Sequence, residues 1–148
     1  RPSPNLPNLQ SIYLYPSLAF LEKTEVSVGR GTKIQFQIYG HPNFISDFSF
    51  TPMPNFGSQY PKLNGKLSFG EDLRNYKTKD KIELKWLIKS YDQISDKTKF
   101  FRSDFDKLSG ISNLKKQIIE GVSESLIRES WKDGLDKFKK IREKYLLY

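Results

Sequence analysis

The 148-residue chain contains no cysteine, one histidine and one methionine. Without cysteine it forms no disulfide, no thiolate metal site and no thiol nucleophile. His41 is the single histidine and no Gly-x-Ser-x-Gly turn occurs, which leaves a Ser-His-Asp triad without support. With no cysteine and one histidine, the chain lacks the usual ligands of zinc, and Asp104 and Asp106 are too small an acid cluster to bind another metal. We therefore expect no metal site.

Long apolar runs are also missing. No stretch approaches the roughly 18 consecutive apolar residues that cross a bilayer, so we expect no membrane span. The chain begins at Arg1 rather than Met, so any signal peptide must precede it. The opening RPSPNLPNLQ is rich in Pro and Asn, and we expect residues 1–8 to be a linker that leads into the fold. The length suits a single domain over residues 1–148, which we interpret as the C-terminal part of a larger protein.

Acidic residues are fewer than basic ones, 17 against 25, which gives a net charge of +8 at pH 7. Such a balance suggests an anionic partner: nucleic acid, acidic lipid or an acidic polymer. Lysines of the second half alternate with acids, as in Lys132-Asp133 and Asp136-Lys137, which is more typical of a solvated helix face than of a nucleic-acid groove. We therefore expect no nucleic-acid partner, and charge alone keeps that function as a third alternative.

Proline is confined to the front of the chain. All eight prolines precede Lys62, whereas lysine-rich helical patterns follow Arg74. This division predicts an α+β fold with a strand-rich front half and a helical C-terminal half. Strands with one buried face are predicted where apolar and polar residues alternate, at residues 25–28, 34–38, 48–50 and 66–69.

Apolar residues at helical spacing predict helical segments at residues 9–21, 80–94, 112–120 and 123–145. Pro16 interrupts the first, so we expect two short pieces or one kinked helix. Asp80 is expected to cap the second, with Glu83 as the acid of a capping box. The last carries a stripe of Ile127, Trp131, Leu135, Phe138, Ile141 and Tyr145, which predicts a buried face.

The stretch VSVGRGTKIQFQIYGHPNF places Arg30 between two glycines. A phosphate loop needs Gly-x-x-x-x-Gly-Lys-Ser/Thr, which is absent. A dinucleotide loop needs a third glycine and a helix directly after it, yet a strand pattern follows here. The residues alone therefore favour a plain hairpin, with Gly29 and Gly31 in the turn and an exposed arginine.

Carbohydrate chemistry has weak support from the residues themselves. A glycosidase needs two carboxylates set across a sugar. The 17 acids are scattered mostly over lysine-rich helix faces, and no pair stands out as catalytic. Aromatic side chains in the loops could stack on a sugar, although most aromatics in a domain of this size serve the core. They are Tyr13, Tyr15, Tyr39, Phe44, Phe56 and Tyr60.

Several segments, taken in this order, resemble one family. They are Pro4–Pro7, Tyr15-Pro16, Val26–Thr32, Gly40-His41-Pro42, Phe50-Thr51-Pro52, Lys62–Lys66, Phe105–Gly110 and Ile141–Tyr148. The series is similar to the C-terminal domain of the NamZ exo-β-N-acetylmuramidases, formerly a domain-of-unknown-function family of bacterial peptidoglycan hydrolases. The resemblance spans nearly the whole chain, is closest to the Bacteroidetes members, and rests on the ordered series rather than on one motif.

The resemblance implies one half of a two-part enzyme. An N-terminal Rossmann-like domain of the same polypeptide, outside this sequence, would carry the catalytic glutamate, and a partly barrel-like C-terminal domain would close one side of the cleft. The enzyme would release terminal N-acetylmuramic acid from the non-reducing end of muramyl glycans of peptidoglycan, without a cofactor, in the periplasm or outside the cell. We therefore expect no catalytic residue in this chain and no activity from it alone.

The resemblance also assigns substrate-binding residues. N-acetylmuramic acid carries a lactyl carboxylate, which a guanidinium binds through two parallel hydrogen bonds. Arg30 is the residue expected to do this, and Thr32 is expected to add a hydroxyl. The full predicted set is Arg30, Thr32, Gly31, His41, Tyr15 and Asn5. Two alternatives stay open: Arg30 pairs with an acid across the interdomain seam, or the chain is a stand-alone module that binds peptidoglycan or another anionic glycan.

Overall fold

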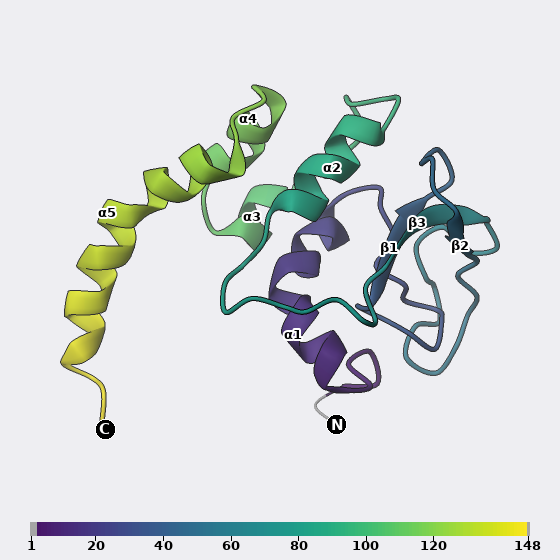
Figure 1. Ribbon diagram of the computed structural model, residues 1–148, viewed down its shortest axis with the longest axis horizontal. Coiled ribbons are helices and arrows are strands. Elements are labelled where there is room, and N and C mark those ends of the chain that lie inside the picture. Colours follow the sequence, from purple (N-terminus) through teal and green to yellow (C-terminus); the bar gives the residue numbers. More distant parts are fainter. Residues whose placement is uncertain (1–2, 148) are drawn as a thin grey trace. The chain divides into compact units, whose positions relative to one another are not determined.

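The computed structural model describes residues 3–147. The chain forms two compact units, Arg1–Ile111 and Ser112–Tyr148, and each is described by itself. The first contains α1 (Leu9–Leu18), the 3₁₀ helix η1 (Ala19–Lys23), β1 (Ile38–His41), β2 (Phe48–Phe50), β3 (Ser68–Asp72), α2 (Lys85–Gln93) and α3 (Phe105–Ser109). The second contains α4 (Asn113–Ile119) and α5 (Glu124–Glu143). The predicted α+β class is confirmed (Figure 1).

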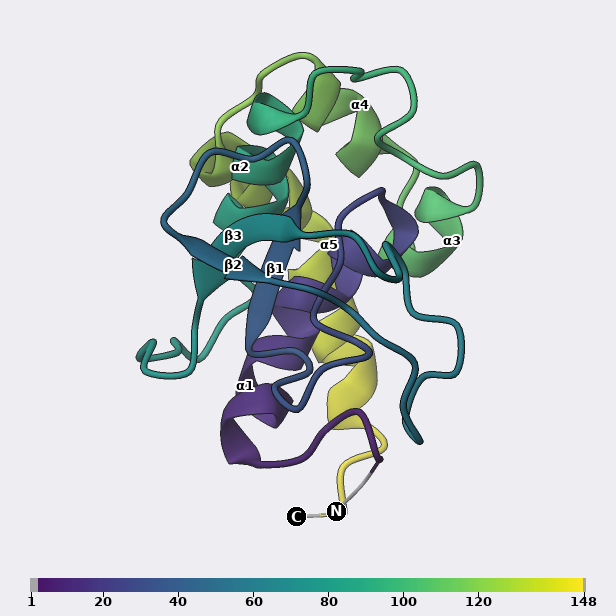
Figure 2. The same cartoon turned by 90° about the vertical axis from the view of Figure 1, so that its right-hand side faces the viewer.

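The sheet of the first unit has three antiparallel strands in the order β1-β3-β2. Both α1 and α2 lie on the same side of it (Figure 1, Figure 2). The strands β1 and β2 each pair with β3 and not with each other, so the sheet is open. The expectation of a partly barrel-like front half is therefore wrong, because three short strands cannot close a ring.

The predicted hairpin around Arg30 is also wrong. Of residues 25–28, Ser27 alone forms a bridge, with Gly40, and the strand β1 begins only at Ile38. Phe36 interrupts the pattern with a left-handed φ of 54°, and its backbone N–H donates to the Val28 carbonyl at 2.8 Å. Residues 35–40 are all buried, so the alternation does not separate a buried face from an exposed one.

The helices follow the sequence more closely. In α1, Pro16 lies in the last turns, and the chain continues directly into η1. The second predicted helix begins at Lys85 rather than after Asp80, because the buried Glu83 instead accepts from the Tyr76 hydroxyl at 2.8 Å. The backbone N–H of Glu83 donates to the Ser17 hydroxyl at 2.9 Å. Glu83 is thus part of the packing rather than of a helix cap.

In the second unit, α5 begins where its N-cap predicts. The Ser123 hydroxyl accepts from the Leu126 N–H at 3.4 Å, as expected for a helix start. The predicted stripe is only partly buried: Ile127 is inaccessible, whereas the apolar side chains of the last turns are exposed. These exposed side chains are Leu135, Phe138, Ile141 and Tyr145.

The strands β1 and β3 meet at two glycines that face each other, Gly40 and Gly70. A Cβ atom added to Gly70 would lie 1.8 Å from the Tyr39 carbonyl oxygen and 2.6 Å from the Gly40 Cα. The strands can approach this closely only because neither position carries a side chain.

We predict that Gly70→Ala lowers the free energy of unfolding by at least about 2 kcal/mol, because the new methyl group collides with backbone. Gly134→Ala is the matched control, since a Cβ at Gly134 in α5 meets nothing within 4 Å. It should raise helix stability by up to about 1 kcal/mol. Chemical denaturation followed by circular dichroism measures both, and an unchanged midpoint for Gly70→Ala contradicts the close approach.

Candidate functional site

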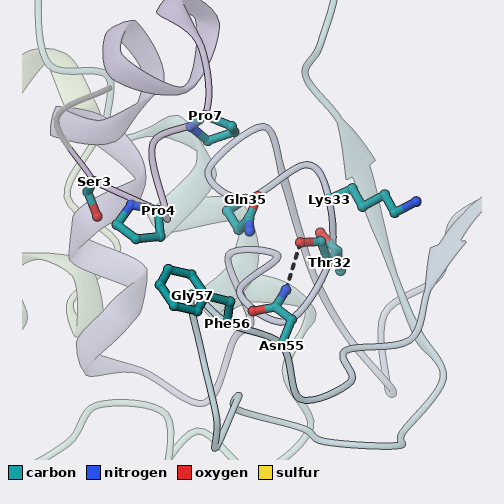
Figure 3. A pocket seen from close by; sticks show the side chains of 9 residues that line it. All are labelled: Ser3, Pro4, Pro7, Thr32, Lys33, Gln35, Asn55, Phe56 and Gly57. Atoms are coloured by element: carbon teal, nitrogen blue, oxygen red, sulfur yellow. Dashed lines mark hydrogen bonds between the residues drawn. The ribbon is translucent and has the colours of Figure 1, made fainter.

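The first unit has an open pocket with a volume of about 650 Å³ (Figure 3). This volume falls within the roughly 300–1,000 Å³ of typical ligand pockets. Three segments form the wall: the N-terminal stretch, the loop after Gly31 and a turn at residues 55–57. The lining residues are Ser3, Pro4, Pro7, Thr32, Lys33, Gln35, Asn55, Phe56 and Gly57. No carboxylate is among them.

The two glycines of the arginine loop give the pocket its shape. Gly29 and Gly31 have φ values of 76° and 81°, in the left-handed region that favours glycine. The Thr32 N–H donates to the Gly29 carbonyl at 3.1 Å and its hydroxyl donates to the same oxygen at 2.7 Å. A Cβ at Gly31 would lie 2.6 Å from the Met53 carbonyl oxygen and 2.7 Å from the Cβ of Pro61. The loop is therefore a tight turn packed against the chain from Met53 to Pro61.

Two asparagines join the segments of the wall: Asn55 bonds to the arginine loop, and Asn5 bonds to the turn at residues 55–57. The Asn55 side-chain amide donates to the Thr32 carbonyl at 3.1 Å, and its Oδ1 accepts from the Ser58 N–H at 2.9 Å. The Asn5 amide donates to the Gly57 carbonyl at 2.7 Å. Phe56 stands between these contacts with 93% of its surface exposed. The pocket is thus held by side-chain bonds to backbone rather than by a sheet.

Arg30 is clamped at the back of the same loop. Its Nε donates to Oε1 of Glu22 at 2.5 Å and its Nη2 donates to Oε2 at 2.9 Å. The guanidinium carbon lies 5.1 Å from the centre of the Phe36 ring. The centre of the Tyr15 ring lies 4.9 Å from the same Phe36 ring centre. The hydrogen bonds that Arg30 donates to Glu22 raise the pKa of Arg30, so it is always charged. Its side chain is 31% exposed.

Lys62 fixes the segment from which Glu22 projects. Its ammonium group donates to four backbone carbonyls at 2.6–3.2 Å, those of Leu21, Glu22, Thr24 and Val26. Burial lowers the pKa of Lys62 to about 7, whereas the four carbonyl oxygens favour its charged form. The carbonyls would otherwise lose a partner in a part of the protein that is shielded from water.

We predict that Lys62→Met lowers the free energy of unfolding by about 3 kcal/mol, because buried carbonyls lose their donor. The matched control is Lys66→Met, four residues along the chain, whose side chain is exposed and which should change stability by less than about 0.5 kcal/mol. Equal denaturation midpoints for the two variants would show that water molecules replace Lys62 as the donor to these four carbonyls.

The structure divides the predicted substrate-binding residues among three places. Thr32 lines the pocket, and Asn5 bonds to its wall. Gly31 lies beside it in the turn. Arg30 and Tyr15 both lie against the Phe36 ring, outside the lining.

His41 lies apart from the others. It ends β1, and its Nδ1 accepts from the Asn43 N–H at 3.2 Å within the local turn. Burial lowers the pKa of His41, so the ring is neutral at pH 7. Its ring centre is 5.7 Å from that of Phe44. In this structure His41 therefore has a local hydrogen-bonding role.

Sequence reasoning did not find Gln35, Asn55 or Lys33. Gln35 looked like a polar residue of a strand, and only its burial together with its place in the pocket marks it. Asn55 begins a short turn closed by reciprocal backbone bonds with Ser58, a pattern that Asn-x-Gly-Ser could have suggested. Phe56 was one of six loop aromatics and could not be chosen among them.

Within residues 3–147, no group of three or more His, Cys, Asp and Glu side chains is placed to hold a metal ion. In the same part of the chain, no helix is both long and apolar enough to cross a bilayer. The pocket offers amides, two hydroxyls, a lysine and apolar rings, so it can bind a polar ligand. It lacks the pair of acids that glycoside hydrolysis requires.

Comparison with known proteins gives the family. The family described as "Exo-beta-N-acetylmuramidase NamZ, C-terminal" matches this chain over residues 13–148. The chain belongs to this NamZ C-terminal family. It is also similar to the peptidoglycan β-N-acetylmuramidase NamZ of Bacillus subtilis, with 32% identity over 99% of this chain and 40% of that protein. The resemblance read from the ordered segments is thus confirmed.

Solved structures agree with the NamZ assignment. A DUF1343 family protein from Bacteroides fragilis has 42% identity and a TM-score of 0.95 over 99% of this chain. A second DUF1343 family protein from the same species has 18% identity and a TM-score of 0.66, which shows a shared fold alone. The chain spans 43% and 44% of these two structures, so it corresponds to less than half of each relative.

Proposed function

We propose that this chain is the C-terminal domain of a peptidoglycan glycosidase that releases terminal N-acetylmuramic acid from the non-reducing end of muramyl glycans. The family match over residues 13–148 and the similarity to the Bacillus subtilis enzyme support this. The domain's part in the reaction is to form one side of the substrate cleft. Peptidoglycan lies outside the cytoplasmic membrane, which favours a periplasmic or secreted protein.

Catalysis is assigned to the remainder of the natural polypeptide. The chain corresponds to 40% of the Bacillus subtilis relative, which leaves room for another domain, proposed here as Rossmann-like. No carboxylate lines the described pocket, so the acid chemistry must come from elsewhere. The polypeptide with its own sequence upstream of Arg1 should release N-acetylmuramic acid, and the 148-residue chain alone should not. A reducing-sugar assay of both tests this, and release by the chain alone contradicts it.

Arg30 is proposed to bind the lactyl carboxylate of the terminal sugar. The observation that carries this is the clamp: Glu22 and Phe36 fix the guanidinium beside the pocket-forming loop. Arginine has five N–H donors and Glu22 takes two of them, so the Nη1 edge stays able to bind a second carboxylate. A guanidinium whose orientation is fixed in advance loses little entropy when the ligand binds.

We predict that Arg30→Lys weakens binding of N-acetylmuramic acid about tenfold or more, because lysine cannot make two parallel bonds to a carboxylate. Binding of N-acetylglucosamine, which lacks the lactyl group, should stay the same. The matched control is Arg74→Lys, which removes another arginine–carboxylate pair, with Asp72, on an exposed turn. Titration of each sugar into the native chain, Arg30→Lys and Arg74→Lys, followed by amide NMR, measures these affinities.

Equal affinity of the native chain for both sugars would overturn the role of Arg30. A second variant, Glu22→Gln, keeps the arginine and loosens its clamp, so it should give an intermediate loss. This variant separates a binding role from a purely structural one, because the arginine's charge is retained in full.

A stand-alone module that binds peptidoglycan is the second candidate. The observation in its favour is that the pocket is complete within the first unit and lacks catalytic acids. If the parent polypeptide holds only a signal peptide before Arg1, this candidate replaces the enzyme.

A further inference from the structure

Two hydrogen-bond acceptors have no donor among residues 3–147: one belongs to Gln35 in the pocket lining, and the other belongs to Asn5, which bonds to the pocket wall. Gln35 is only 7% exposed, and its Oε1 has no donor among the residues that the structure describes. The Oδ1 of Asn5, which bonds to the pocket wall through its amide nitrogen, also has none. A buried acceptor without a donor costs roughly 1–3 kcal/mol. A ligand that supplies an N–H or O–H donor here would recover that energy.

Gln35 is the side chain that is able to adapt. Asn55 uses its amide nitrogen for Thr32 and its oxygen for Ser58, and the Thr32 hydroxyl is held by Gly29. Figure 3 shows the Gln35 amide at the back of the pocket, between Pro4 and Thr32. A half-turn of its terminal amide exchanges the donor and the acceptor, so it can match a group that carries one of each.

The rest of the lining suits the flat, apolar face of a sugar. Pro4 and Pro7 supply apolar rings, and Phe56 supplies an exposed aromatic ring next to Pro4 (Figure 3). Lys33 is the single charged side chain of the lining, which disfavours a cationic ligand. An acetamido group has one N–H donor, one carbonyl acceptor and one methyl group, and this pocket offers a partner for each.

We propose that the pocket binds the acetamido group of an uncharged sugar, as a second subsite beside Arg30; this inference rests on the proposed function. Arg30 is not part of the lining, so the two subsites have different residues. Thr32 joins them, because it lines the pocket and follows Arg30 by two residues, at most about 7 Å between Cα atoms. The subsite at Arg30 recognises the carboxylate, and the subsite at Gln35 recognises the acetamido group.

The test compares N,N′-diacetylchitobiose with cellobiose, which has the same linkage but no acetamido groups. The native 148-residue chain should bind the first at least about tenfold more tightly, the ratio expected for one satisfied amide hydrogen-bond pair. Gln35→Leu should abolish this preference. Gln37→Leu is the matched control: Gln37 is also buried, but it bonds to Asn8 and does not line the pocket.

Phe56→Ala provides a variant that cannot fail through misfolding, because the side chain is 93% exposed. It should weaken binding of both disaccharides, while Ile45→Ala, at 94% exposure and outside this pocket, should not. Equal affinity for the two disaccharides, or a preference that survives Gln35→Leu, overturns the acetamido subsite.

Failure of the subsite can be told apart from failure of the proposed function. The Arg30→Lys variant should bind diacetylchitobiose like the native chain. If the native chain discriminates N-acetylmuramic acid from N-acetylglucosamine through Arg30, yet Gln35→Leu leaves diacetylchitobiose unaffected, only the second subsite is wrong. If the Gln35-dependent preference holds without any discrimination at Arg30, the muramyl assignment is wrong and the pocket binds another acetamido sugar.

Discussion

The loops of the first unit depend on the ammonium group of Lys62, which holds four backbone carbonyls of residues 21–26 at 2.6–3.2 Å. An ammonium has three donors, so at least one bond is shared between two acceptors. This contact ties the end of η1 and the residues directly after it to a loop some 40 residues away in sequence. It also sets where Glu22 stands, and Glu22 in turn sets the orientation of Arg30. One largely buried cation thus determines the position of a half-buried one.

The second constraint is the left-handed turn at Gly29 and Gly31. A two-stranded hairpin here would have sent alternate side chains to opposite faces of a sheet. The turn, together with the positive φ of Phe36, instead places neighbouring residues in different environments. Gln35 faces the pocket, whereas Phe36 lies against both Arg30 and Tyr15. A guanidinium and a buried amide therefore lie close together in sequence without a sheet beneath them.

The sequence predicts the elements that depend on contacts between residues close in sequence, and it fails where contacts between distant residues decide the structure. The start of α5 at Ser123 depends on a cap three residues away, and β2 coincides with the predicted strand at residues 48–50. The alternation over residues 34–38 was misleading because tertiary packing buries all of residues 35–38. The delayed start of α2 has a similar cause, since Glu83 bonds to Ser17, 66 residues away, rather than capping a helix.

The candidate site shows the same limit. Arg30 and Thr32 were predicted because the glycines beside them and the ordered family segments are visible in sequence. Gln35 was not, because a polar residue in an alternating stretch looks the same whether it faces solvent or an apolar pocket. Its missing donor can be seen only once the fold has removed it from water. The family name came from the ordered segments, and the residues that shape the pocket came from packing.

The proposed binding of an anion by a paired arginine depends on the other charges near the arginine loop. Glu22 neutralises Arg30 locally, so this pair alone offers little net field. Lys62 and Arg102 lie close enough to act electrostatically on the same cluster, with Glu25 as the other acid. The cluster therefore has a positive surplus only while Lys62 keeps its proton, which burial opposes and the four carbonyls favour. The contact that holds the loops in place is also the one that preserves the charge an acidic sugar would meet.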